Sequence, residues 1–183
     1  MPRTTTAGMY LSYAVETTPG QRPTTGYTII DEVKSMPDTN PAPASVDSTT
    51  LAETEYVTKE PALKDLGDSL DYTVNFTDEL EEAIDALVDK QEAAESEGKA
   101  VWFCEAHRKI KKATYYTGKI AHINFGESSV GAMLETSLHI TPTGAPVREE
   151  KAPGTTPAPE GGTPEGTSYS VRQTTKKTTG VEV

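Results

Sequence analysis

Three histidines and one cysteine are the side chains of this sequence best suited to bind a metal ion or to act as a nucleophile. His107, His122 and His139 fall in three different predicted strands, so a zinc site requires that the fold bring them together. Cys104 needs a neighbouring base to become a nucleophile, and the sequence indicates none beside it. Isolated histidines on strand faces and a buried structural thiol are the ordinary interpretation, so we predict no metal site.

Paired carboxylates are the remaining groups that could do chemistry. Asp68 with Asp71, or Glu79 with Glu82, could serve as general acid and general base. Such pairs arise by chance in a chain that has 28 acidic residues. The sequence contains no glycine-rich phosphate loop and none of the common hydrolase, metalloprotease or EF-hand patterns. We therefore predict a protein that is not an enzyme, with no catalytic residue and no cofactor.

Length and composition describe a small acidic protein. The 183 residues suffice for one domain of about 140 residues with additional arms. A net charge of -11 argues against a general nucleic-acid binder, which gains affinity by neutralising phosphates. The single cysteine excludes an intramolecular disulfide framework, and no apolar run is long enough to span a bilayer. We expect no membrane partner and a reducing compartment.

The charges are unevenly distributed along the chain. Residues 31–97 contain 19 acids and 4 bases, whereas residues 99–125 contain 6 bases and one acid. An acidic face of one copy could meet a basic face of the next, which favours self-association. A solvated surface that keeps the protein soluble is an equally good explanation of the charges alone.

Alternating apolar and polar residues predict about six strands. The clearest lies at 69–77, where Leu70, Tyr72 and Val74 alternate with polar residues. A second is predicted at 130–141, with Val130 at the start of its apolar face. Aromatic and β-branched residues predict the others, at 9–16, 27–34, 100–107 and 113–125, the last with a bulge at Gly118.

One amphipathic helix is predicted at 78–97. Its apolar stripe recurs at helical spacing and should pack on the strands; it consists of Leu80, Ala83, Ile84, Leu87 and Val88. Asp78 and Glu81 form a D-x-x-E start, and Gly98 is a plausible stop. Strands with one inserted helix predict a mainly β fold, a β-sandwich or small barrel with one flanking α-helix.

Two stretches dilute the apolar content. Residues 36–68 are rich in Pro, Asp and Thr and lack periodicity, which predicts a long inter-strand loop. Residues 147–183 form a Pro/Gly/Thr-rich, flexible C-terminal extension that is too polar to bury its own core. We therefore predict a β domain over 1–146, followed by this extension.

Several segments, taken in order, carry a resemblance to a known family. They are residues 33–36 leading into the long loop, the strand 70–76, the helix 80–88, the aromatic-x-Gly strand 115–120, and the closing strand 136–144. Together they cover roughly residues 8 to 147. In this order and spacing the chain resembles the tail tube (major tail) proteins of long non-contractile-tailed bacteriophages, the lambda-like tube family.

The resemblance implies a structural virion protein that forms hexameric rings. The rings stack into the phage tail tube, the conduit for DNA ejection, and DNA passes through the lumen without specific binding. The implied partners are further copies of the chain and other tail proteins (tape measure, tail terminator and tail tip). The implied location is the virion tail, after assembly in the host cytoplasm.

The resemblance also implies roles for individual residues. The long loop would reach the adjacent ring through Val46, Asp47, Thr49, Thr50, Leu51, Glu53 and Glu55. The polar strand faces would line the lumen, and their candidates are Asp71, Thr73, Asn75, Glu135 and Ser137. The helix would pack through Leu80, Ile84, Leu87 and Val88.

Two other classes remain open. One is a capsid decoration or tail-tip adaptor protein on a similar sandwich. The other is a small ligand-binding β-sandwich module in which the C-terminal extension is a linker. Long hollow fibres would indicate a tube protein, and monomers that stay monodisperse at high concentration would favour the binding module.

Overall fold

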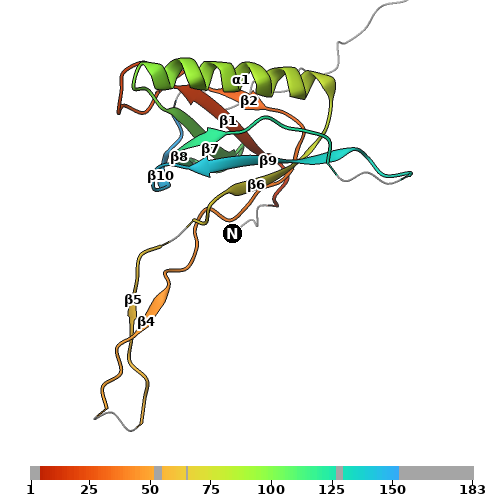
Figure 1. The fold of residues 1–183 in the computed structure, drawn as a ribbon. Coiled ribbons are helices and arrows are strands. Elements are labelled where there is room, and N and C mark those ends of the chain that lie inside the picture. Colours follow the sequence, from red (N-terminus) through yellow and green to blue (C-terminus); the bar gives the residue numbers. More distant parts are fainter. Residues whose placement is uncertain (1–4, 52–54, 65, 127–129, 153–183) are drawn as a thin grey trace, which may run out of the picture.

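An antiparallel sheet with one helix on its side forms the body of the protein, and a two-stranded hairpin projects from it (Figure 1). The computed structural model describes residues 5–51, 55–64, 66–126 and 130–152. The fold is mainly β, with a sheet that is almost a closed barrel. In chain order the elements are β1 (Met9–Val15), β2 (Thr28–Ile30), β3 (Val33–Ser35), β4 (Ser45–Asp47), β5 (Lys59–Pro61), β6 (Leu70–Asn75), α1 (Asp78–Ser96), β7 (Val101–His107), β8 (Lys112–Ile120), β9 (Glu135–Pro142) and β10 (Val147–Glu150).

The two ends of the sheet come close together because the strand predicted at 27–34 is broken in two. The sheet runs β2-β1-β7-β8-β9-β6-β3, so β2 and β3 stand at its two ends although only two residues separate them. Glu32 makes the break with a φ of 63°, a left-handed conformation that is uncommon for a residue with a Cβ. The backbone N–H of Asn75 donates to the Glu32 carbonyl at 3.0 Å, and the Asn75 side chain donates to its carboxylate at 2.8 Å. These bonds hold the chain where it passes from one end of the sheet to the other.

The central strands β1, β7 and β8 are buried on both faces. Tyr115 and Tyr116 are neighbours in β8 and point to opposite sides, yet both are fully buried. Tyr116 belongs to the main core, between the strands and the helix. Tyr115 is covered on the outer side by the Arg22 guanidinium, 4.1 Å above its ring, and by the edge of Tyr27. The segment between β1 and β2 therefore serves as an outer cover for the sheet.

The buried carboxylate of Glu16 fixes the start of the segment between β1 and β2 to the end of β7. Glu16 accepts hydrogen bonds from the Trp102 indole N–H at 2.7 Å and from the backbone N–H groups of Gly20 and Ala100 at 3.0 and 3.1 Å. Burial acts to raise the pKa of Glu16, but the three donors outweigh it, and the pKa lies below its usual value. The ionised form of Glu16 is therefore the form that the fold stabilises.

Helix α1 begins at Asp78, as predicted, but its N-cap lies one residue before the D-x-x-E pattern. Thr77, in an extended conformation, is the N-cap, and its hydroxyl accepts from the backbone N–H of Leu80 at 3.2 Å. At the other end Gly98 has a φ of 71°, and the N–H groups of Gly98 and Lys99 bond back to the carbonyls of Glu95 and Ala94. These two bonds form a Schellman motif, so Gly98 ends the helix as predicted.

The buried face of α1 includes the predicted stripe apart from Ala83, which is exposed. Leu80, Ile84, Leu87 and Val88 all pack into the main core. Gln91 is buried as well: its amide oxygen accepts from the backbone N–H of Ile120 at 2.8 Å, and its amide nitrogen lies 3.4 Å from the Ile120 carbonyl. This side chain therefore ties the helix to the end of β8.

Three details of the strands differ from the prediction. The bulge predicted at Gly118 is wrong, because the pairing runs through it without a register shift; a Cβ there would lie 2.8 Å from Ile140 Cγ2, so close packing requires the glycine. The strand predicted from residue 130 begins only at Glu135, and Val130 is fully exposed. Strand β8 ends at Ile120, well short of residue 125.

The C-terminal boundary also lies later than predicted. Strand β10 pairs with β8 from Val147 to Glu150, and the backbone N–H of Ala152 donates to the Tyr115 hydroxyl at 2.8 Å. The boundary predicted at residue 146 therefore falls inside the sheet, and the fold continues to Ala152. The rest of the predicted extension, residues 153–183, lies outside the described residues.

Candidate functional site: a polar barrel face and a projecting arm

The five residues predicted to line a lumen lie together on one outward face of β6 and β9. The two strands pair in antiparallel register, with Thr73 opposite Ser137 and Asn75 opposite Glu135. Asp71 continues the face, opposite His139. The alternate residues of both strands point into the core, because successive side chains of a strand face opposite sides. The structure thus brings two predicted polar strips, about 60 residues apart in sequence, into one continuous surface.

Much of the charge on this polar face is compensated. Asp71 Oδ1 lies 2.7 Å from His139 Nδ1, and this hydrogen bond, with a further one from Ser69, holds the pKa of Asp71 below its usual value. Glu135 forms an ion pair with Lys34, a residue of β3, the strand that pairs with β6. The face therefore carries two carboxylates, one paired with a lysine and the other hydrogen-bonded to a histidine, among uncharged polar side chains.

The long loop predicted at 36–68 contains a β-hairpin that the sequence did not indicate. β4 pairs with β5, with Val46 opposite Glu60. Bonds within the hairpin include that from the Thr58 backbone N–H to the Thr49 hydroxyl, at 3.0 Å. We call residues 37–51 and 55–64 the arm, because they project away from the barrel (Figure 1). A loop without strands is thus the wrong description of this segment.

The arm presents apolar side chains to solvent. The predicted contact residues among the described part of the arm are all exposed: Val46, Asp47, Thr49, Thr50, Leu51 and Glu55; Glu53 lies outside the described residues. Leu51 has its full surface exposed, at 107%. The sequence prediction missed three further exposed apolar residues on the returning leg, Tyr56, Val57 and Leu63. The signal was available, since adjacent Tyr and Val are unusual in an otherwise polar stretch.

The histidines do not form one site. Each has its own partner: His107 is buried with Nε2 2.9 Å from the Ala7 carbonyl, His122 pairs with Asp85 at 2.6 Å, and His139 pairs with Asp71. In the described ranges no group of three or more His, Cys, Asp or Glu residues is placed to hold a metal ion.

Cys104 is fully buried, and burial raises the pKa of its thiol to about 11. At neutral pH it is therefore a protonated, packed thiol and a poor nucleophile.

A polar cluster lies inside the barrel, on the core side of β6, β7 and β8. The Tyr72 hydroxyl donates to Glu105 Oε1 at 2.5 Å and lies 2.5 Å from the Tyr116 hydroxyl. Since Tyr72 gives its single hydrogen to the carboxylate, Tyr116 donates to the Tyr72 oxygen. The second carboxylate oxygen, Glu105 Oε2, accepts from the Thr39 hydroxyl at 3.1 Å. The sequence prediction missed this cluster, which links the arm to the interior.

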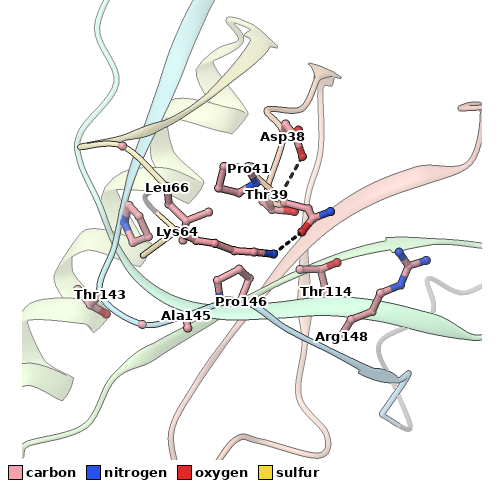
Figure 2. A pocket seen from close by; sticks show the side chains of 14 residues that line it. Asp38, Thr39, Pro41, Lys64, Leu66, Thr114, Thr143, Ala145, Pro146 and Arg148 are labelled. Carbon is pink, nitrogen blue, oxygen red and sulfur yellow. Dashed lines mark hydrogen bonds between the residues drawn. The ribbon is translucent and has the colours of Figure 1, made fainter. Parts of the chain in front are cut away.

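A cleft of about 760 Å³ separates the root of the arm from the link between β9 and β10 (Figure 2). Residues 38–41 form one wall with Lys64 and Leu66, and residues 142–146 form the other. The Lys64 ammonium reaches across to Asn40 Oδ1 at 3.2 Å, which joins the two legs of the arm to each other. Arg148 lies at one end of the cleft.

Comparison of the sequence with models of protein families and with curated proteins gave no match. Within the described residues, α1 is too polar to cross a bilayer.

Proposed function

We propose that this protein is the subunit of a bacteriophage tail tube, a structural virion protein whose hexameric rings stack into the conduit for DNA ejection. Its partners would be further copies of the chain, with the tape measure, tail terminator and tail tip proteins at later stages. Assembly would take place in the host cytoplasm and the product would be part of the virion tail. DNA would pass through the lumen without being bound specifically.

The arm carries this proposal. A monomeric soluble protein gains nothing from a long hairpin that exposes apolar residues, since those residues contribute no folding energy where they stand. Val46, Leu51 and Tyr56 belong to the arm, and each is more than half exposed. An apolar projection of this kind suits insertion into a neighbouring subunit, which in a stacked tube is a subunit of the adjacent ring.

The polar face of β6 and β9 suits the lumen of a DNA conduit. A basic wall would release counterions from the duplex and hold it tightly. On this face Lys34 is neutralised by Glu135, and the remaining side chains are hydroxyls, an amide and the Asp71–His139 pair. Such a surface neither binds phosphates strongly nor offers a hydrophobic patch on which a duplex would be retarded.

Electron microscopy of the purified full chain tests the proposal. At high concentration we expect long hollow fibres of uniform diameter that are built from stacked rings. Monodisperse monomers at the same concentration would contradict the proposal and favour the ligand-binding module. Isolated oligomers that never elongate would favour the capsid decoration or tail-tip adaptor class.

A further inference from the structure

The Glu105 carboxylate lies at the point where the arm meets the barrel. It belongs to β7, is 8% exposed, and has the fully buried Tyr72 below it. One of its oxygens accepts from Tyr72 and the other from Thr39, so both are used. Thr39 is only half-buried and belongs to the outgoing leg of the arm. A rigid interior group and a surface segment thus share one carboxylate.

The ionised form of Glu105 suits this arrangement best, because a carboxylate can accept from two donors and charge-assisted bonds are about twice as strong as neutral ones. Burial opposes that form: it raises the pKa of Glu105 above its usual value, against the lowering effect of the Tyr72 and Thr39 hydroxyls, and nearby Asp38 raises it further. The other titratable groups around the carboxyl are Tyr116, bonded to Tyr72, and Cys104 on the opposite face of β7. Protonation therefore takes place at a higher pH than for an exposed glutamate, and it weakens the bond to Thr39.

The surroundings of the arm root leave room for movement. On one side Met36 packs partly against the core, just before the arm begins. On the other side lies the cleft of about 760 Å³, whose far wall is the link at 142–146 (Figure 2). The bond between Lys64 and Asn40 joins the two legs, so that they would move as one piece. The arm root therefore has a packed residue before it, an open space beside it, and one side-chain hydrogen bond to the barrel, from Thr39 to Glu105.

We propose that the Glu105 carboxylate is the anchor that sets the direction of the arm, and that loss of its bond to Thr39, by substitution or by protonation, lets the arm swing into the cleft. Glu105 is in these terms a positioning residue: it touches no partner itself and acts through the arm. The inference concerns the free subunit, so it stands or falls independently of whether the chain forms tubes.

The distance between the arm and the far wall of the cleft tests this proposal. Nitroxide labels are attached at Ser45→Cys on the arm and Ala145→Cys on the wall, both exposed positions, in the full chain kept at monomeric concentration. Cys104 stays unlabelled because it is buried and protonated. Pulsed electron paramagnetic resonance then gives the distribution of distances between the two labels. At neutral pH we expect one narrow distance, which broadens and shortens at mildly acidic pH.

Variants identify the group responsible. In Thr39→Val the distribution of label distances should be broad already at neutral pH, because the substitution removes the hydroxyl that donates to Glu105. Glu105→Gln should give a distribution that no longer changes with pH, whereas Asp38→Asn should keep the acid response. Thr49→Val is the matched control: it removes a hydrogen bond inside the arm, from the Thr58 backbone N–H, and should leave the distance narrow.

Two results would overturn the proposal. One is a Thr39→Val protein with the same narrow distance as the parent at neutral pH. The other is an acid response that persists in Glu105→Gln. The first result is decisive even if Glu105→Gln does not fold, because Thr39 is only half-buried and its substitution leaves the Tyr72–Glu105 and Tyr72–Tyr116 hydrogen bonds in place.

Discussion

The substitution Leu51→Ser, in the part of the arm that follows β4, should weaken assembly without lowering the stability of the subunit. Leu51 is fully exposed in the subunit, at 107%, so Leu51→Ser removes no buried contact and should change the free energy of unfolding by less than about 0.5 kcal/mol. If the arm inserts into a neighbour, burial of this leucine stabilises the contact by about 1.5–3 kcal/mol. Since every 1.4 kcal/mol is about tenfold in an equilibrium constant, the critical concentration for tube growth should rise on the order of 10- to 100-fold.

Pelleting of fibres over a concentration series measures the critical concentration, and urea unfolding of the subunit measures stability. Val130→Ser is the matched control, because Val130 is equally exposed, at 108%, but lies outside the arm. It should leave the critical concentration unchanged. The reasoning fails if Leu51→Ser assembles like the parent, or if both substitutions raise the critical concentration equally.

Three further predictions concern the stability of the barrel. Gln91→Met should lower the free energy of unfolding by about 1–3 kcal/mol in urea titrations, because it leaves the buried N–H of Ile120 without its acceptor. Gly118→Ala should cost about 1–3 kcal/mol and lower the melting temperature, since its Cβ would lie 2.8 Å from Ile140 Cγ2. The pKa of Glu16 lies below its usual 4.5, so ionised Glu16 stabilises the fold above pH 4.5, and this stabilisation is lost as the pH falls through the folded-state pKa. Glu16→Gln should therefore reduce the fall of the urea midpoint with decreasing pH in that acidic range. An unchanged midpoint in Gln91→Met, an unshifted melting temperature in Gly118→Ala, or an unaltered acid limb in Glu16→Gln would contradict the respective structural reason.

The helix and most barrel strands could be predicted because their signals are local. The stripe from Leu80 to Val88 repeats at helical spacing, and β6 alternates at strand spacing, so each pattern marks its own buried side. The D-x-x-E pattern points to Asp78 as the first residue of the cap, whereas the N-cap is Thr77. Both residue types are good N-caps, and only the extended backbone of Thr77 in the structure identifies it as the cap.

The hairpin of the arm could not be predicted in this way. Every residue of β4 and β5 is exposed, so no alternation marks either strand. Its pairing depends on backbone bonds between residues 45–47 and 59–61, which leave no trace in the pattern of hydrophobic residues. The exposure of Leu51 and Tyr56, which makes the arm a candidate interaction surface, is known only from the structure, in which no described residue covers these two side chains.

The sequence by itself determined which residues of β6 and β9 face away from the core, because that choice follows from the alternation of side chains along a single strand. Only the tertiary structure decided that these two polar strips form one surface, since the pairing and register of strands about 60 residues apart depend on how the whole sheet is assembled. The same holds for Glu105. Its strand is evident from the sequence, but its contact with Thr39 exists only because the barrel brings the arm root over β7, where the two oxygens of one buried carboxylate accept from both.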